Sequence, residues 1–125
     1  MAADIAYADL AYKVLTAADV AALDAGVFQG APIDIADGYI HLSTAEQLTE
    51  TVQRHFAGQT HLTVAAVDLA ALGGTVRWEV SRNGQRFPHV YGKLEPSSII
   101  ARGPLEWGGD GTVLVPAVLN RVPSS

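Results

Sequence analysis

The segment Asp37–Thr44, with the sequence DGYIHLST, constrains this chain most, because a turn, a short strand and the start of a helix fall within it. Side chains alternate along a strand, so Tyr39, His41 and Ser43 share one face. The isoleucine and leucine between them point the opposite way and can anchor the strand in a core. We therefore predict a polar site in which an aromatic ring, an imidazole and a hydroxyl are held together by a rigid scaffold.

A helix is expected directly after this strand. Ser43 and Glu46 have the S-x-x-E spacing of a capping box, which predicts Ser43 as the N-cap. The helix should run to about Phe56 and stop at Gly58. Its buried stripe recurs every four residues and consists of Leu48, Val52 and Phe56.

The remaining chain predicts more strands than helices. We expect Thr16 to cap a helix over Ala17–Ala25, and Pro88 to give the extended segment Arg86–Leu94 an edge or irregular position in a sheet. The other expected strands are Tyr12–Leu15, His61–Val67, Thr75–Ser81, Ser97–Ala101 and Leu105–Trp107. A loop over Gly30–Gly38, a helical turn over Asp68–Leu72, and turns at Asn83-Gly84 and Gly108–Gly111 connect these elements.

This order of elements predicts an α+β fold with two small, mostly antiparallel sheets and with the helices in the N-terminal half. The length of 125 residues fits one domain over residues 1–125, and an apolar fraction of 49% is enough for a core. We expect residues 1–10 and 120–125 to be a loose leader and tail.

Charge and composition exclude several function classes. The formal charge is −5 with eight Lys and Arg together, and no basic run exists, so broad capture of nucleic acid is disfavoured. The absence of cysteine excludes disulfides, thiolate metal sites and cysteine nucleophiles. No apolar run reaches the roughly 20 residues that span a bilayer, and the N-terminus lacks a basic signal-peptide region. We expect a soluble, cytoplasmic protein without a membrane partner.

A second polar patch is Arg77-Trp78-Glu79, in an alternating segment. Arg77 and Glu79 face together, whereas Trp78 is expected to pack in the core. Glu79 could orient a ligand hydroxyl or stabilise a developing cation, and the planar guanidinium of Arg77 suits an anion. The alternative is a solvated strand face with a cross-strand ion pair.

A third patch is Phe87–Gly92, with the sequence FPHVYG. If this segment is extended, His89 and Tyr91 share a face, and Tyr91 could stack on a flat ring and donate a hydrogen bond. The alternative is an aromatic loop that folds back over the sheet.

Other interpretations of these polar residues have to be considered. His41 taken alone could be a structural histidine. A metal site formed by His41, His89 and Glu79 is disfavoured, and no metal is expected, because no H-x-x-x-H or H-E-x-x-H spacing exists. Ser43 lies in no G-x-S-x-G elbow, which argues against a catalytic triad, and Gly108–Gly111 lacks the lysine of a phosphate loop.

Taken together, the three blocks Asp37–Thr44, Arg77–Glu79 and Phe87–Gly92 resemble the DUF952 family of small bacterial proteins, with His55-Phe56 also fitting. The resemblance runs from about Tyr12 to Leu119. It implies a fold like the catalytic domain of ADP-ribosyltransferases, in which two small sheets split around a cleft that holds NAD in active members. It also implies kinship with RNA 2′-phosphotransferases.

The resemblance implies a role for His41, which matches a strand histidine that binds the nucleotide's ribose in those enzymes. Glu79 and Tyr91 match later positions of the enzymes by residue type only. The leading hypothesis is a cleft for a nucleotide or nucleotide-sugar related to NAD, with ribosyl transfer if the protein is an enzyme and with His41 and Glu79 as the catalytic residues. The expected ligand-binding residues are Tyr39, Ser43, Thr44, Arg77, His89 and Tyr91.

Two other hypotheses stay open from the sequence. The first is a binding module that uses the same cleft without turnover. The second is a structural or interaction protein in which the apolar segment Val113–Leu119 pairs with another chain. The ligand, any acceptor of the transfer and the oligomeric state are not fixed by the residues.

Overall fold

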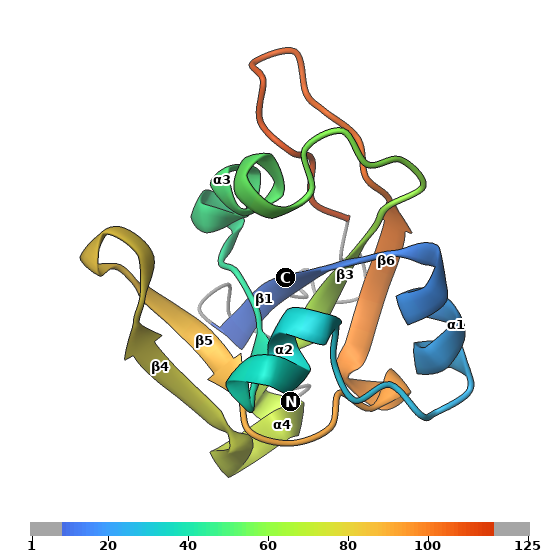
Figure 1. Cartoon of the computed structure of the whole chain (residues 1–125), viewed down its shortest axis with the longest axis vertical. Helices are drawn as coiled ribbons and strands as arrows, with labels where there is room; N and C mark the ends of the chain where they lie inside the picture. The colour runs from blue at the N-terminus through green and yellow to red at the C-terminus, as the bar shows by residue number, and fades with distance from the viewer. Residues whose placement is uncertain (1–8, 117–125) are drawn as a thin grey trace, which may run out of the picture.

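The structure is a computed structural model and describes residues 9–116. Two three-stranded antiparallel sheets form its framework (Figure 1). The first sheet has the order β1-β3-β6, formed by Leu10–Leu15, Thr63–Asp68 and Ile99–Pro104. The second has the order β2-β5-β4, formed by Ile40–His41, Arg86–Val90 and Val76–Val80. The α-helices are α1 (Ala17–Asp24), α2 (Pro32–Asp37), α3 (Ala45–His55) and α4 (Leu69–Leu72). The predicted α+β architecture with two small antiparallel sheets is confirmed.

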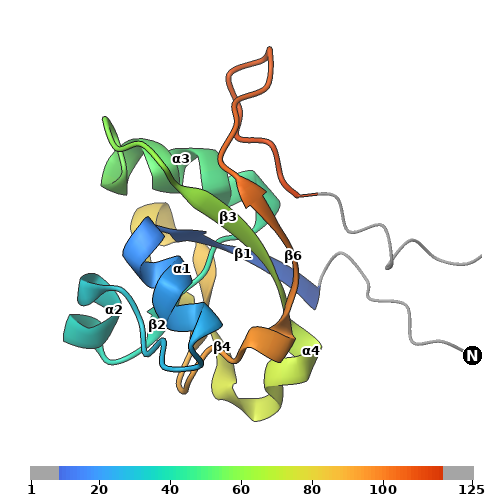
Figure 2. The same cartoon turned by 90° about the vertical axis from the view of Figure 1, so that its right-hand side faces the viewer.

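The first sheet is covered on both faces, and each face has its own apolar core. Helix α3 lies across one face (Figure 2), while α1 and the second sheet cover the other. The core beneath α3 contains Tyr12, Val14, Leu48, Val52, Leu62, Val64, Ala66 and Val113. The opposite core contains Ala11, Leu15, Leu23, Phe28, Ile40, Leu42, Ala65, Val67, Leu69, Val90 and Leu94. The predicted stripe of α3 is confirmed, because Leu48 and Val52 are buried and Phe56 packs against them.

The segment after α2 joins the two sheets to each other. Strand β2 pairs with β5, with His41 opposite His89. The chain then reaches β1 through an isolated bridge in which the Tyr12 and Ser43 backbones exchange N–H···O bonds of 2.7 and 2.9 Å. Ile40 and Leu42 are each 1% exposed and anchor the segment, as its alternation predicts. The site residues therefore lie where the sheets meet.

The loop predicted over Gly30–Gly38 is wrong, because Pro32–Asp37 forms α2. Pro32 occupies the first turn, where its missing N–H costs nothing, and the Asp34 carboxylate accepts the Ala31 N–H at 2.8 Å. Gly38, at φ 88°, ends the helix in the left-handed region. The proline and the Asp-Gly pair are thus the start and stop of a short helix.

The N-cap of α3 is also shifted by one residue from the prediction. Thr44 is the cap: its hydroxyl accepts the Gln47 N–H at 3.3 Å, and the Gln47 side chain accepts the Thr44 N–H at 3.0 Å. Ser43 is not a cap, because its backbone still pairs with Tyr12 in the bridge between the sheets. Its hydroxyl bonds Thr51 Oγ1 at 2.8 Å instead.

This shift makes a testable prediction for stability. Thr44→Ala removes the capping oxygen and should lower the free energy of unfolding by about 1 kcal/mol. Glu46→Ala, which removes the partner of the rejected Ser43 box, should change it by less than about 0.5 kcal/mol. Urea unfolding of both variants checks the assignment, and a larger loss for Glu46→Ala would restore Ser43 as the cap.

The β4–β5 hairpin corrects two further expectations. Trp78 is 41% exposed and not in the core, and Val80 is 61% exposed, because β4 is an edge strand whose outer face is uncovered. Pro88 is in the central strand of the second sheet and not at an edge. The position tolerates proline because β2 ends at His41, so the ladder needs only the Pro88 carbonyl, which accepts the Leu42 N–H at 3.1 Å.

Most other elements form as predicted. Thr16 caps α1 in a box with Asp19, β3 is the central strand of the first sheet, and Gly108–Gly111 is a turn. Strand β1 begins at Leu10, and β6 runs to Pro104, so Leu105–Trp107 contributes a bridge to Val113 and not a strand of its own. Most of the expected leader and all of the expected tail lie outside the described residues. None of the helices within residues 9–116 has the length and apolar character needed to cross a bilayer.

Candidate functional site

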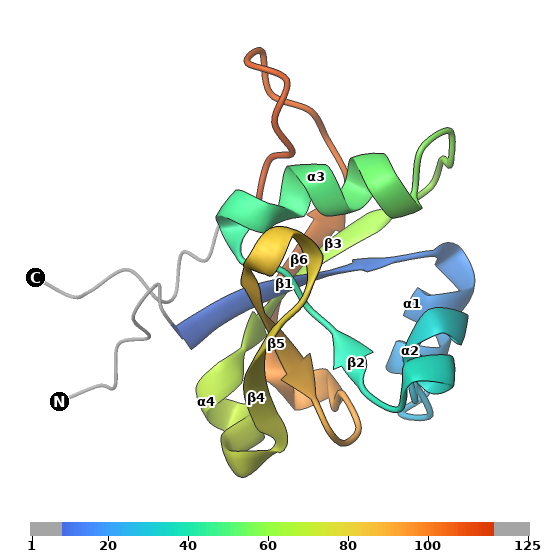
Figure 3. The same cartoon turned by 60° about the vertical axis from the view of Figure 1, so that its left-hand side comes forward.

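Strands β2 and β5 lie side by side where the two sheets meet (Figure 3). Four rings from these strands and their ends form a cluster there. Tyr39 stacks on His89 with ring centroids 4.1 Å apart, and it lies 4.7 Å from His41 and 5.2 Å from Tyr91. The rings of His41 and His89 meet edge to face at 5.4 Å. Residues from the first and third sequence patches therefore form one cluster, because β2 pairs with β5.

A buried carboxylate that the sequence did not single out holds His41 in place. Asp34 Oδ1 accepts the His41 backbone N–H at 3.1 Å and contacts Nδ1 of the ring at 2.6 Å. Asp34 Oδ2 contacts Lys13 Nζ at 2.8 Å and accepts the Ala31 N–H. The side chains of Asp34 and Lys13 are 0% and 7% exposed, so this ion pair is removed from water.

Close packing around Asp34 explains Gly30. A Cβ atom at Gly30 would lie 2.7 Å from the Asp34 Cβ, and the backbone there has φ 126°. Only glycine fits both the space and the backbone angle. Lys13 also donates to the His41 carbonyl at 3.0 Å, so the buried ion pair bonds both the backbone N–H and the carbonyl of His41.

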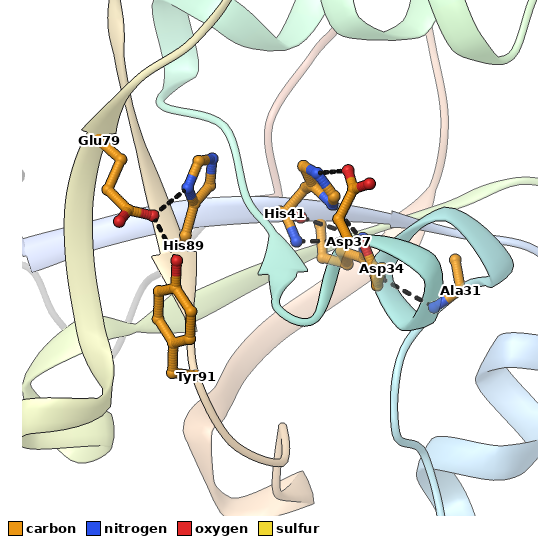
Figure 4. Close-up of polar contacts among 8 residues, drawn as sticks. Ala31, Asp34, Asp37, His41, Glu79, His89 and Tyr91 are labelled. Atoms are coloured by element: carbon orange, nitrogen blue, oxygen red, sulfur yellow. Dashed lines mark hydrogen bonds and ion pairs between the residues drawn. The ribbon is translucent and has the colours of Figure 1, made fainter.

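A second carboxylate faces the other nitrogen of His41. Asp37 Oδ2 lies 2.9 Å from His41 Nε2, and the Asp37 side chain is 43% exposed. The imidazole thus lies between a buried carboxylate and a solvent-facing one (Figure 4). A ring held this way is oriented firmly from the core side and open to exchange of its outer partner.

The network predicts acid sensitivity. Burial raises the pKa of Asp34, but the His41 hydrogen bond and the charge of Lys13 outweigh burial and lower it from 3.8 to about 2. A carboxyl with a lowered folded pKa stabilises the fold above its unfolded pKa and loses that contribution as the pH falls. We expect about 2 kcal/mol of stability to disappear between about pH 4 and pH 2. Urea unfolding across this range checks it, and a flat profile would contradict it.

Glu79 is held by two donors on a single oxygen. Oε1 lies 2.7 Å from Nδ1 of His89 and accepts the Tyr91 hydroxyl at 2.8 Å (Figure 4). The hydrogen bonds from His89 and Tyr91 lower the pKa of Glu79, and the same contact raises the pKa of Tyr91. The side chain is 40% exposed, so an ionised carboxylate faces solvent at the rim of the ring cluster.

Arg77 completes the rim. It precedes Glu79 on the same face of β4, and its guanidinium carbon lies 5.5 Å from the centre of the Tyr91 ring. The alternative interpretation expected a cross-strand ion pair on this face, and Glu79 on β4 makes such a contact with His89 on β5. The Arg77–Glu79 face is therefore turned toward the site, and the Trp78–Val80 face is turned to solvent.

A pocket of about 110 Å³ lies beside the imidazoles, between the sheets and α3. Its polar lining includes Lys13, Asp34, His41, Ser43, Thr51, His55, Ser81 and His89. Its apolar lining includes Tyr12, Val14, Ile33, Leu42, Phe56 and Phe87. Tyr39, Glu79 and Tyr91 lie outside this lining and meet it through the histidine rings. Among residues 9–116, no three His, Cys, Asp or Glu side chains form a group able to hold a metal ion.

The structure separates the candidates from the sequence into two groups. Tyr39, His41, Arg77, Glu79, His89 and Tyr91 lie together at the junction. Thr44 does not join them, because its hydroxyl and N–H are used in capping α3. Ser43 lines the pocket, with its hydroxyl bonded to Thr51.

Asp34, Asp37 and Lys13 are the site residues that sequence reasoning missed. Lys13 carried a readable signal, because it is the lone charge in the otherwise apolar strand LAYKVL and needed a buried partner. Asp37 precedes His41 by four residues and could have been paired with it across the turn. Asp34 was hidden because its segment was assigned to a loop.

Comparison with known families and structures gives a consistent result. The family model described as "Protein of unknown function (DUF952)" matches residues 14–102. The crystal structure of protein CC0527 from Caulobacter crescentus is 42% identical, with a TM-score of 0.76 over 84% of this chain and 93% of that one. The solution structure of CC0527 is 40% identical, with a TM-score of 0.70 over 92% and 97% of the two chains. No curated protein matches this chain.

Proposed function

This chain belongs to the DUF952 family, and we propose that its junction site binds a nucleotide or nucleotide-sugar related to NAD and supports ribosyl transfer from it. The proposal includes the ADP-ribosyltransferase-like fold that the family resemblance implies. Two small sheets that meet at a polar junction are compatible with that fold. The chemistry has to be argued from the residues of the site, because a fold alone does not establish an activity.

The observation that carries the proposal is the Glu79 carboxylate. His89 and Tyr91 both bond Oε1, and no other bond engages Oε2 within the part of the chain that the structure describes. The hydrogen bonds from His89 and Tyr91 lower the pKa of this carboxyl and favour its ionised form. Loss of a leaving group from a ribose builds positive charge on the sugar, and a fixed carboxylate stabilises such a transition state. Glu79 is held for that role, with Oε2 available to the ligand.

The surrounding groups fit the other parts of a nucleotide-sugar. Arg77 offers a guanidinium to a phosphate, and the adjacent Tyr91 ring offers a stacking face. His41 offers Nε2 to a ribose hydroxyl or a phosphate, which would replace the solvent-facing Asp37. Tyr39 already stacks on His89, so in this proposal it holds the imidazoles in place. The base or nicotinamide ring of the ligand then stacks on Tyr91.

The size of the pocket limits where the ligand lies. Pockets that enclose drug-sized ligands measure about 300 to 1,000 Å³, and this one measures about 110 Å³. A nucleotide-sugar would therefore lie mainly over the exposed rim formed by Arg77, Glu79 and Tyr91. Only one small group of the ligand would enter the pocket between the sheets.

Titration of the protein with NAD, ADP-ribose and 2′-phosphorylated nucleotides, followed by amide chemical shifts, tests the proposal. We expect saturable shifts at Tyr39–His41 and Glu79–Tyr91, and we expect His41→Ala to abolish them while leaving the rest of the spectrum unchanged. His61→Asn, at an exposed histidine with φ 59°, is the control and should bind normally. Absence of shifts at millimolar ligand would reject nucleotide binding, and shifts without NAD consumption would favour the binding module.

A second candidate, an interaction role, rests on the hairpin after β6. Trp107, Leu114 and Val115 are 47%, 48% and 41% exposed on it. Val113 is buried in the core beneath α3, and the part of Val113–Leu119 after residue 116 lies outside the described residues. Sedimentation that shows a stable dimer, together with failure of every nucleotide titration, would favour this candidate.

A further inference from the structure

His89 is the buried group whose second nitrogen the proposed function leaves unused. Its side chain is 3% exposed, and Nδ1 lies 2.7 Å from Glu79 Oε1. A neutral imidazole carries one proton, and an ionised carboxylate only accepts, so that proton lies on Nδ1. Nε2 then carries a lone pair. Its direction is away from Glu79 (Figure 4).

Within the part of the chain that the structure describes, no hydrogen bond reaches Nε2 of His89. A buried acceptor without a donor is costly, so such an atom is expected to meet a water or a ligand. His89 lines the pocket between the sheets, whereas Glu79 and Tyr91 do not. The second nitrogen therefore belongs to the pocket side of the ring.

Charge and size restrict what the pocket accepts. Lys13 lines the pocket, but its ammonium is paired with the buried Asp34 carboxylate and is not available to a charged ligand. An apolar cavity of about 150 Å³ holds a benzene molecule, and this pocket of about 110 Å³ holds a somewhat smaller group. Phe87 and Phe56 give it apolar walls, and Ser43 with Thr51 gives it a polar patch. A small neutral group with a hydroxyl fits this description.

We propose that this pocket is an acceptor subsite for a small neutral hydroxyl group, of an alcohol or of water, and that His89 Nε2 is the general base that takes its proton. The inference rests on the proposed ribosyl transfer and names its acceptor. In the step, the acceptor O–H proton moves to Nε2 while the oxygen bonds the anomeric carbon of the ribose. The bond to the leaving group breaks and its electron pair leaves with that group. The imidazolium then releases the proton to the leaving group or to solvent.

The two oxygens of Glu79 have different roles in this arrangement. Oε1 orients the imidazole and stabilises the imidazolium as it forms, and Oε2 faces the ribose. Tyr39 covers one face of the His89 ring, and the His41 edge approaches it from β2. These contacts fix the ring plane, so the lone pair keeps its direction into the pocket.

Side-chain ¹⁵N spectra of the histidines test the first step without any activity, at a pH where the rings are neutral. We expect His89 to carry its proton on Nδ1 and Glu79→Ala to lose that tautomer. Ethylene glycol should shift the His89 Nε2 resonance in a saturable way. A proton on Nε2, or no response to ethylene glycol, would overturn the inference.

Turnover tests the base itself, with NAD as donor and methanol as acceptor. His89→Asn keeps an amide toward Glu79 and removes Nε2, and it should lower kcat by about 10² to 10⁴-fold while NAD-induced amide shifts persist. His89→Gln places an amide without basicity near the position of Nε2, and its kcat should be lowered by the same factor. This variant replaces His89→Asn in the test if His89→Asn does not fold. Unchanged kcat in a folded variant would overturn the inference. If NAD causes no amide shifts in the unmodified chain, the proposed function is rejected. The ¹⁵N measurements then test by themselves whether the pocket binds a hydroxyl group at His89 Nε2.

Discussion

Replacing Asp34 by asparagine should lower the free energy of unfolding by about 3 to 5 kcal/mol, the cost of removing one partner of a buried ion pair. The Asp34 carboxylate accepts from Lys13, Ala31 and His41, and its side chain is 0% exposed. The variant leaves the Lys13 ammonium, which is 7% exposed, without its counter-charge. Because domains of this kind are stable by about 5 to 15 kcal/mol, the loss should be plain in urea unfolding.

Two controls separate the buried charge from general damage at this place. Asp37→Asn removes the other carboxylate on His41, but that side chain is 43% exposed, so the loss should stay below about 1 kcal/mol. Lys13→Met combined with Asp34→Asn removes the orphaned charge and should be more stable than Asp34→Asn alone. If the double variant is less stable than the single one, or if Asp37→Asn costs as much, the ion pair is not the element that fixes the junction.

Replacing Glu79 by glutamine should lower the kcat of ribosyl transfer by about 100 to 1,000-fold, as removal of one preorganised charge-stabilising group does in other enzymes. Glutamine keeps the shape and an acceptor for Tyr91 but removes the negative charge. That charge matters only when positive charge develops on the sugar, so the affinity for NAD should change little. Steady-state rates and amide-shift titrations of the same samples separate the two quantities.

Glu50→Gln is the matched control for this variant. Its side chain is 38% exposed against 40% for Glu79, and it pairs with Arg54 on α3 away from the rings. It should leave kcat unchanged. Equal kcat in Glu79→Gln and the unmodified chain, with turnover measured, would remove Glu79 from the chemistry.

Strand alternation was the most reliable guide to the site. It placed Tyr39 with His41 and His89 with Tyr91, and pairing of β2 with β5 then brought both pairs together. Alternation depends only on the backbone, which is why it could be inferred from the residues alone. Which strands pair depends on the whole fold, and neither alternation nor the family resemblance indicated that β2 pairs with β5.

The errors have a common physical origin in tertiary contacts. Ser43 has the residue type and spacing of a cap, but pairing with Tyr12 keeps its backbone extended and moves the cap to Thr44. Trp78 alternates like a core residue, but it lies on a strand whose outer face no element covers. Local sequence cannot report either a distant strand or a missing layer.

Asp34 is the instructive omission. Proline, aspartate and glycine in a short segment indicate a loop, and here the same three residues start, cap and end α2. The buried Lys13 required a counter-charge, and Asp34 supplies it from a segment far away in the chain. A search for the partner of a lone charge in an apolar strand would have been the route to this residue.

A crystal structure of the protein soaked with ADP-ribose is the most direct test of the account. We expect the ligand over the rim at the junction of the sheets, with a ribose hydroxyl at His41 Nε2 in place of Asp37, the sugar against Glu79 Oε2 and the phosphates beside Arg77. Ligand bound at another surface, or a junction unchanged and empty at saturating ligand, would contradict it.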